Sequence, residues 1–300
     1  MKENKVMKKR RKGSWTKGLG AWMFLLPAVL LFVLTKYIPI LMGMFISFFD
    51  IDIVNLPGKF CGFNNYIRAF TDAKFYSSMW HNVKFMIYSF TMNFWPPIVA
   101  AILVNEMRKS KLAFRVLYFI PAVAPGLAMT VIWKYFWNPD YGLANYLLSL
   151  FGMGPHAWLN DPKLVYFCMH FSGLVIVGGM NMLIYLAALQ DVPQELYESA
   201  MLEGAGFFKR IRYITLPCIK GIVASMFLLS FTGVFNALEQ VLMWTDGGPY
   251  GKTETLLSYA YKQALSSLDY SYAITMATIV FLVTFILTVI IRKILARAED

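Results

Sequence analysis

Charged residues are scarce in this chain of 300 residues: Asp, Glu, Lys and Arg together make up 15%, and hydrophobic residues make up 58%. In soluble globular domains the charged share is nearer a quarter. This deficit excludes an ordinary soluble domain. The charges that remain are unequal, because 28 Lys and Arg face only 17 Asp and Glu, for a net charge of +11.

Cysteine is also rare. The three cysteines, Cys61, Cys168 and Cys218, are odd in number and scattered without a C-x-x-C pair, so neither a disulfide framework nor a zinc site is expected. The three histidines, His81, His156 and His170, are isolated, with no H-x-x-x-H pair among them. The chain also holds no H-E-x-x-H and no G-x-S-x-G motif. We therefore expect no metal, no cofactor and no catalytic residue, and we do not expect the chain to be an enzyme.

Long uncharged runs take the place of the missing charges. A bilayer core of about 30 Å requires roughly 20 apolar residues in a helix, and helices of that length satisfy their own backbone hydrogen bonds in lipid. The runs predict an all-α polytopic membrane protein with six transmembrane helices. They are residues 21–35 continued after Lys36 by 37–49, then 85–105, 116–133, 164–190, 221–238 and 270–291.

The placement of Lys and Arg predicts the orientation. Of the 28 basic residues, 19 lie in four clusters: residues 2–17, 107–115, 190–220 and 292–297. By the positive-inside rule these segments are cytoplasmic, and so are both termini. Six spans require both ends on one side, which agrees. Anionic membrane lipid is the expected partner of the positive charge, and no nucleic acid partner is expected.

These boundaries predict four parts. Residues 1–20 are expected to be a cytoplasmic basic tail, and residues 21–80 an uncleaved first transmembrane helix with an outer segment. Residues 81–295 are expected to form a core of five helices with a long cytoplasmic loop at 190–217, and residues 296–300 a cytoplasmic tail.

The loop at 190–217 contains a predicted helix followed by a bend. Pro193 is suited to a helix start and acidic residues follow in the first turns, where the helix dipole favours them. Gly204 and Gly206 then interrupt the helix. Two interpretations remain open: an amphipathic helix on the inner leaflet, or a rigid lever that presents one face to a cytosolic partner.

The same loop resembles the Glu-Ala-Ala loop of the membrane subunits of bacterial binding-protein-dependent ABC importers. Ser199 and Glu203 depart from that pattern, replacing Ala and Asp. Further stretches occur in the family's order, among them "FCGFNNYIRAFTD", "FRVLYFIPAVAP" and "TDGGPYGKTETLLSYAYKQAL", and the resemblance is nearest to the sugar permeases of the maltose and oligosaccharide type. The residues that match the loop pattern are Glu198, Ala200, Gly204, Ala205, Ile214, Leu216 and Pro217.

The resemblance implies a type I ABC importer permease fold in the bacterial plasma membrane. It implies three partners: a second homologous permease, cytoplasmic ATP-binding subunits and an extracellular solute-binding protein. The outer-loop signature and the full first span favour the first-type permease of a heterodimer. The loop would be the coupling helix that docks on the ATPase through Glu198, Ala200, Glu203, Gly204 and Ala205.

The stretch "GGPYGKT" superficially resembles a phosphate-binding loop, but only three residues separate Gly247 from Gly251, where that motif requires four. By resemblance it belongs to an external loop in which Gly247, Gly248, Pro249 and Thr253 contact the solute-binding protein. Residues 254–265 are expected to form a short helix within that loop.

Polar residues inside the spans are the candidates for a substrate path, because they are costly in lipid and usually face the bundle interior. The candidate residues are Met180 and Asn181 in the fourth span and Ser230, Asn236 and Glu239 in the fifth. Each polar group could equally make an interhelical hydrogen bond with no role in transport.

Two functions of different classes compete. The first is the permease subunit of an ABC importer that passes a sugar or oligosaccharide into the cell, with ATP hydrolysis in separate subunits. The second is an ion-coupled secondary transporter or channel that acts without an ATPase. Glu239 is the single acidic residue near a membrane interior, and no inverted repeat is visible in the sequence, which favours the first.

Overall fold

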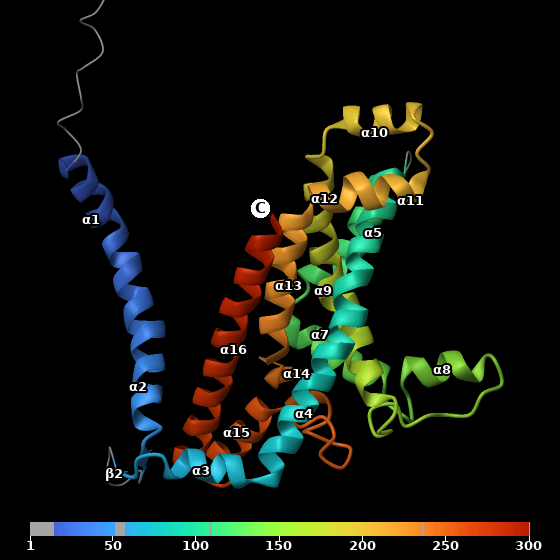
Figure 1. Cartoon of the computed structure of the whole chain (residues 1–300). Helices are drawn as coiled ribbons and strands as arrows, with labels where there is room; N and C mark the ends of the chain where they lie inside the picture. Colours follow the sequence, from blue (N-terminus) through green and yellow to red (C-terminus); the bar gives the residue numbers. More distant parts are fainter. Residues whose placement is uncertain (1–14, 52–57, 108–109, 236, 300) are drawn as a thin grey trace, which may run out of the picture.

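The computed structural model describes residues 15–51, 58–107, 110–235 and 237–299, and these are mostly helical (Figure 1). They also include loops and one antiparallel ladder, in which Phe49 of β1 faces Phe60 of β2. Helices written η are short π-helical segments within longer helices. The elements are α1 (Trp15–Phe32), η1 (Val33–Tyr37), α2 (Ile38–Ile46), β1 (Phe49–Asp50), β2 (Lys59–Phe60), α3 (Asn64–Thr71), α4 (Ala73–Tyr88), η2 (Ser89–Phe94), α5 (Trp95–Glu106), α6 (Lys111–Val123), α7 (Gly126–Phe136), α8 (Leu143–Ser149), α9 (Val165–Gln190), α10 (Gln194–Leu202), α11 (Phe207–Arg210), η3 (Ile211–Thr215), α12 (Leu216–Cys218), α13 (Lys220–Phe235), α14 (Leu238–Trp244), α15 (Leu256–Leu265) and α16 (Tyr270–Glu299).

Within these residues, four helices are long and apolar enough to cross a bilayer, and two bent helix pairs raise the number to as many as six. The prediction of a polytopic helical membrane protein is confirmed at this level. The four continuous stretches are Trp22–Ile46, Ala73–Glu106, Val165–Gln190 and Tyr270–Leu295.

The expected third span is broken. The uncharged run 116–133 predicted one helix, but α6 and α7 meet at an angle of 97°. Ala124 has an extended backbone, with ψ of 145°, and the next residue is Pro125. Proline disfavours the helical conformation in the residue before it, so the break has a local cause. A second break of 73° separates α12 from α13.

The second span starts earlier than the sequence indicated. The outer segment was expected to continue to Trp80, whereas α4 begins at Ala73, capped by the Asp72 side chain. The helix then runs through η2 into α5, for 34 residues in total. The N-terminal helix also extends beyond its expected start at residue 21, because α1 begins at Trp15. The first fourteen residues of the expected tail lie outside the described part of the chain.

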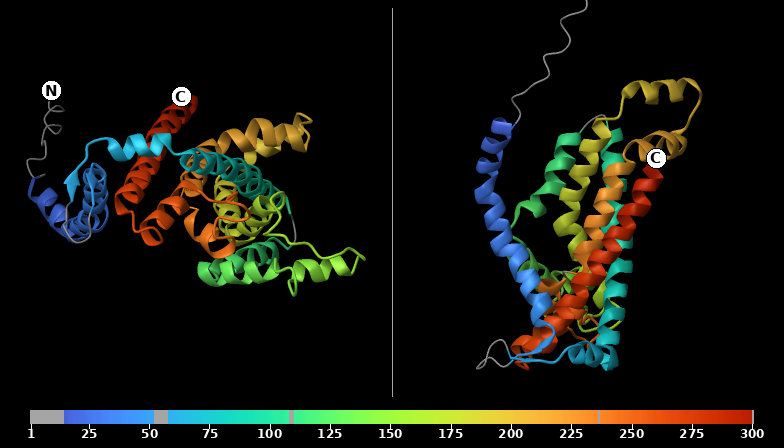
Figure 2. Two further views of the ribbon diagram at one scale, coloured as in Figure 1. Left: turned by 90° about the horizontal axis from the view of Figure 1, so that it is seen from below. Right: turned by 60° about the vertical axis from the view of Figure 1, so that its left-hand side comes forward.

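The first span stands apart from the other helices along most of its length (Figures 1 and 2). No residue of the apolar stretch Trp22–Ile46 is fully buried within the molecule. Contact with the core occurs at its lower end, where α2 meets α16.

The remaining helices enclose three groups of buried apolar side chains. One group joins α5 to α9 and α13, a second joins α3, α4, α13, α15 and α16, and a third joins α4, α7, α9 and α14. The closest backbone approach is that of α6 to α9. A Cβ atom on Gly179 would lie 1.8 Å from the carbonyl oxygen of Tyr118, so this position admits only glycine without displacement of α6.

Both ends of the described chain lie on one side of the molecule, together with α10 to α12 (Figure 1). We call this side the inner end. The opposite side carries α3, α8, α15 and the loop Thr245–Thr255, and we call it the outer end.

Candidate functional site

The most exposed part of the inner end is a helix, a sharp turn and a second helix, formed by residues 194–218. We call this segment the coupling loop, after the coupling helix that the resemblance implies for it. Its first helix, α10, ends in a Schellman motif: the N–H of Ala205 donates to the carbonyl of Ala200 at 2.8 Å, and the N–H of Gly204 donates to that of Met201 at 3.0 Å. Gly204 has a φ of +77°. The predicted bend at Gly204 is therefore present, and a residue with a Cβ atom is disfavoured there.

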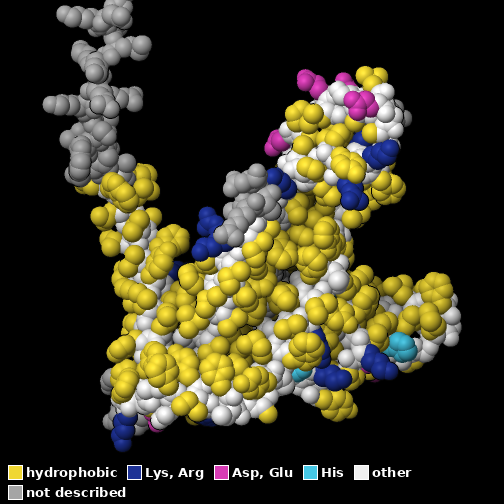
Figure 3. All heavy atoms as spheres, in the orientation of Figure 1, with side chains coloured by type: hydrophobic (Ala, Val, Ile, Leu, Met, Phe, Trp, Pro, Cys, Tyr) yellow, Lys and Arg dark blue, Asp and Glu magenta, His cyan; other side chains and the backbone are white. Residues whose placement is uncertain are grey.

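The two faces of α10 differ. Glu195, Glu198 and Leu202 follow one another at helical spacing and are exposed, with Leu202 90% accessible. Figure 3 shows acidic side chains gathered over the end of the molecule that α10 forms. On the other face, Tyr197 and Met201 line a cavity beneath the helix. The outward face of α10 thus presents carboxylates and an exposed leucine to whatever lies beyond the inner end.

The coupling loop is attached to the helix bundle by apolar packing of Tyr197, Phe207, Ile211 and Ile214 and by a few polar contacts. Buried Val192 and Ile219 lie at its two ends among side chains of α5 and α9. Tyr197 and Thr215 share a hydrogen bond of 3.1 Å between their hydroxyl groups. The guanidinium of Arg210 lies 3.8 Å from the Glu106 carboxylate at the end of α5. The other residues of the expected docking set, Ala200, Glu203 and Ala205, lie between these anchors.

A cavity of about 330 Å³ opens between η2, α9 and α13, and we call it the central cavity. Two of the expected path residues line it, Asn181 and Ser230. Met180, 48% exposed, is not among its lining residues, and neither is the exposed Glu239. Asn236 lies outside the described residues. The structure therefore brings together one residue from each of the two expected spans.

Three further polar residues line the central cavity: Ser89 and Asn93 of η2 and Gln240 of α14. The side-chain oxygen of Asn93 is buried and has no hydrogen-bond partner among the described residues. This oxygen is therefore an unsatisfied acceptor in the wall of the cavity. The sequence contained a signal for it, since Asn93 is the one amide inside the uncharged run before Asn105, but the run was interpreted only as a span.

His170 also borders the central cavity, although it serves the packing. Its Nδ1 lies 2.8 Å from the carbonyl oxygen of Tyr166 and its Nε2 lies 3.1 Å from that of Phe85. His170 is thus both packed between helices and placed at the edge of the cavity. Among the described residues, no group of three or more His, Cys, Asp or Glu side chains could hold a metal ion.

At the outer end, the loop Thr245–Thr255 corrects one expected contact. Thr253 is fully buried, and its hydroxyl donates to the carbonyl of Gly248 at 2.6 Å and shares a hydrogen bond of 2.7 Å with Thr245. It shapes the loop and cannot meet a partner through its side chain. The exposed tip is Tyr250, which is 92% accessible and was not expected. Gly247, Gly248 and Pro249 lead to that tip.

A buried carboxylate holds this loop in place. Glu254 has a side chain only 6% exposed and pairs with Lys74 of α4 at 3.1 Å and with Lys262 of α15 at 3.3 Å. Lys262 also pairs with Asp246, at 3.1 Å. The next element, α15, begins at Leu256 as expected for the region 254–265, and the buried Asn82 side chain accepts its first N–H at 2.9 Å.

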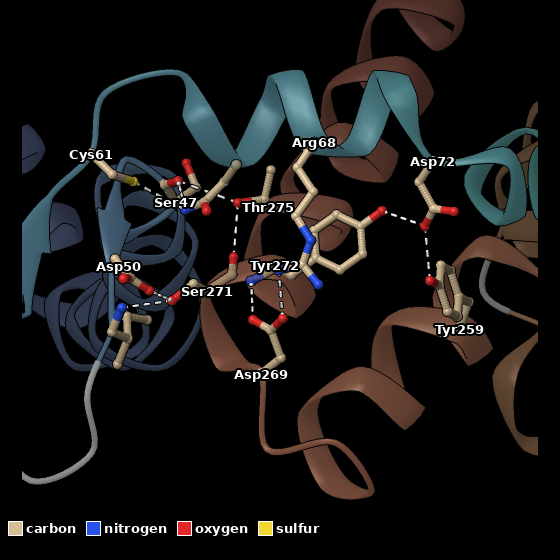
Figure 4. Close-up of polar contacts among 12 residues, drawn as sticks. Ser47, Asp50, Cys61, Arg68, Asp72, Tyr259, Asp269, Ser271, Tyr272 and Thr275 are labelled. Atoms are coloured by element: carbon tan, nitrogen blue, oxygen red, sulfur yellow. Dashed lines mark hydrogen bonds and ion pairs between the residues drawn. The ribbon is translucent and has the colours of Figure 1, made fainter.

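A second polar network joins the first span and α3 to α15 and α16 (Figure 4). The Asp72 carboxylate accepts hydrogen bonds from the hydroxyls of Tyr259, at 2.8 Å, and Tyr272, at 2.7 Å. Desolvation by burial pushes the pKa of Asp72 upward, but these hydrogen bonds and those from the N–H groups of α4 outweigh it, so the pKa lies below its ordinary value. The pKa of Tyr259 is raised to about 12 by burial and by its bond to Asp72.

The same network reaches the first span. The hydroxyl of Thr275 donates to the carbonyl of Ser47 at 3.2 Å, and the N–H of Ile51 donates to the hydroxyl of Ser271 at 2.6 Å. Arg68 completes it with a 2.6 Å ion pair to Asp269 while lying 4.1 Å above the ring of Tyr272.

Comparison with known proteins shows that residues 96–299 match one family, described as the binding-protein-dependent transport system inner membrane component. The chain is 31% identical over 283 residues to the probable ABC transporter permease protein YurN of Bacillus subtilis (strain 168), covering 93% of this chain and 97% of that one. It is 30% identical to the trehalose/maltose transport system permease protein MalF of Thermococcus litoralis, covering 87% and 88%.

A third relative is the arabinooligosaccharides transport system permease protein AraP of Bacillus subtilis (strain 168), 29% identical over 93% of this chain and 89% of that one. Among solved structures, the fold matches a chain of a bacterial ABC transporter involved in the import of the acidic polysaccharide alginate. The TM-score is 0.84 with 21% identity, over 95% of this chain and 98% of that one.

Proposed function

The chain belongs to the family of binding-protein-dependent transport system inner membrane components, and we propose that it is the permease subunit of an ABC importer for a sugar or oligosaccharide. Relatives whose names state a sugar substrate support the substrate class: trehalose and maltose, arabinooligosaccharides, and lactose. The chain is a multi-pass membrane protein and a transport component.

The observation that carries the proposal is the coupling loop. It projects from the inner end, exposes Glu198 and Leu202 on one face, and is turned by the Schellman motif at Gly204. A loop that only joined two spans would not need a helix held away from the bundle. The loop is suited to receive force from a separate ATPase subunit through α10 and to pass it along α11 and α12 to α13.

The orientation follows from the positive-inside rule. The inner end is cytoplasmic, six spans cross the membrane when each bent pair counts as one, and the outer end faces the solute-binding protein. Tyr250 and the loop around Gly247 are the expected contacts with that protein. One related structure contains an alginate pentasaccharide-bound periplasmic protein, which supports a partner at this end.

The central cavity is the proposed substrate path. Asn181, Ser230, Asn93 and Gln240 supply amide and hydroxyl groups, which pair with sugar hydroxyls. A second permease chain would close the open side of the path. In the transport cycle, ATP binding and the loaded binding protein would each favour the outward-open state, since a ligand shifts a conformational equilibrium only by differential affinity for its two states.

Co-purification tests the proposal. The chain is purified from its host in mild detergent and accompanying proteins are identified by mass spectrometry. We expect a second permease and an ATPase, and we expect Glu198→Lys to reduce ATPase recovery at least tenfold. Asp246→Lys, the same charge reversal at an exposed position of the outer end, is the control and should leave recovery unchanged.

The competing secondary transporter makes the opposite prediction. The lone chain would then move sugar in vesicles that lack ATP, driven by an ion gradient. Such uptake, together with no ATPase in the purified sample, would overturn the importer proposal.

A further inference from the structure

A second polar cavity, with a volume of about 560 Å³, lies at the inner end beneath α10. Its walls come from the ends of α5 and α9, the start of α6, the cavity-facing side of α10, and α11. Volumes of this size are typical of small-ligand sites. The substrate path does not use this space, because no residue is shared with the central cavity.

Arg210 is the most unusual residue in this cavity. Its side chain is 18% exposed, and its Nε atom is buried without a hydrogen-bond partner among the described residues. Its one ion pair within the described part of the chain, to Glu106, has a length of 3.8 Å, which exceeds hydrogen-bond distance. Buried donors of a charged group are normally satisfied. The Arg210 guanidinium therefore keeps donors that no described residue satisfies.

The surroundings favour a negative charge. Lys111 lines the cavity and begins α6, and Gln194 lines it and begins α10. Neither helix has a side-chain hydrogen bond capping its N-terminus. Helix N-termini carry free N–H groups and a partial positive charge.

The Glu106 carboxylate and the carboxyl ends of α5 and α9 oppose this positive potential. Two full positive charges nevertheless face one carboxylate, and three amide side chains add neutral donors: Asn105, Gln190 and Gln194.

We propose that the cavity beneath α10 binds a phosphate group, with Arg210 as its main ligand and Lys111 as a second. A guanidinium fork matches two phosphate oxygens at once. The group could be carried by a free phosphate compound of the cytosol or by an anionic phospholipid headgroup. In either case the ligand would join α5, α6 and α10, and would thereby stiffen the attachment of the coupling loop.

The test uses the full chain, delipidated in a phosphate-free detergent, titrated with inorganic phosphate at constant ionic strength in a calorimeter. Arg210→Gln removes the proposed ligand. Arg212→Gln is the matched control, because Arg212 is exposed two residues away and does not line the cavity. We expect saturable binding to wild type and to Arg212→Gln, and at least tenfold weaker binding to Arg210→Gln.

A parallel arm adds short-chain phosphatidylglycerol and follows thermal unfolding. If the headgroup of a lipid is the ligand, this lipid raises the Tm of wild type and Arg212→Gln but not of Arg210→Gln, while inorganic phosphate has no effect. Lys111→Gln should weaken whichever probe binds, and it serves if Arg210→Gln fails to fold. Equal responses of the Arg210 and Arg212 variants to both probes would overturn the proposal. Neither arm measures transport, so the result is independent of the proposed function.

Discussion

The two ends of the molecule are built on different principles. At the outer end, buried charges have partners: Glu254 lies between two lysines, and Asp72 accepts from two tyrosines. At the inner end, α10 has no buried residue, and the coupling loop's ion pair to the bundle spans 3.8 Å. The outer end pairs its buried charges, whereas the inner end leaves the acidic face of α10 exposed.

This contrast indicates which end requires another protein for its structure. An outer end whose buried charges are already paired can bind and release a partner protein without changing its structure. The helices α10 and α11 expose Leu202 and Phe208, 90% and 82% accessible, and these two side chains become buried only when a partner covers them. Variants at the two ends should therefore affect different quantities. At the outer end we expect a change in the free energy of unfolding, and at the inner end a change in how much sugar is transported per ATP hydrolysed.

The largest expected effect comes from the buried carboxylate at the outer end. Glu254→Gln keeps the shape but removes the charge that pairs with Lys74 and Lys262, and we expect a loss of about 2 kcal/mol in the free energy of unfolding. Asp246→Asn is the control, since its side chain is 75% exposed and its pair with Lys262 contributes about 0.5 kcal/mol. Chemical unfolding in detergent measures both. If both variants lose the same unfolding free energy, the buried Glu254 pairs stabilise the outer end no more than an exposed ion pair does.

At the inner end, Gly204→Ala should introduce about 1 kcal/mol of backbone strain, because the residue has a φ of +77° although space for a Cβ atom is open. We expect less sugar transported per ATP hydrolysed by the reconstituted importer, with membrane insertion unchanged. Gly206→Ala, whose φ of −69° suits any residue, is the control. If the two variants transport equally well, the bend does not transmit force.

The smallest effect should appear as a dependence on pH at the outer end. Because the folded-state pKa of Asp72 is lowered, its ionised form stabilises the fold at pH values above the unfolded-state value of about 3.9, and this contribution disappears as pH falls through the folded value. Asp72→Asn should lower stability at neutral pH by on the order of 1 kcal/mol and flatten the acid limb of the stability curve. Unfolding followed between pH 3 and pH 7 measures this. If wild type and Asp72→Asn lose stability with the same slope as pH falls, the acid dependence comes from other carboxylates.

The sequence predicted those features that depend on neighbouring residues. The fourth span, expected at 164–190, is α9 at Val165–Gln190, and the bend at Gly204 is where two glycines interrupt a short helix. Both follow from charge scarcity and local propensity, which act over a few residues. The last span likewise begins at Tyr270 as expected.

The features that were missed depend on segments distant in the sequence or on a signal given too little weight. The burial of Thr253 requires the loop to close on Gly248 and Thr245, and the pairing of Glu254 requires α4, nearly two hundred residues earlier. The break before Pro125 was different, because the proline was visible but the uncharged run was taken as one helix. Apolar composition shows that a segment can lie in lipid and gives no information about whether it is straight.

The isolation of the first span has a consequence for the order of assembly. No residue of the apolar stretch Trp22–Ile46 is fully buried, and the span meets the bundle at its outer end, where α2 packs against α16 and where Ser47 and Ile51 bond to α16. In the two-stage view of membrane protein folding, helices first insert individually and then associate. This helix can complete the first stage by itself, because its insertion does not depend on burial against the other described helices. Its packing against the bundle has to await α16, the helix that α2 meets at the outer end, so the first span is among the last parts to be joined to the fold.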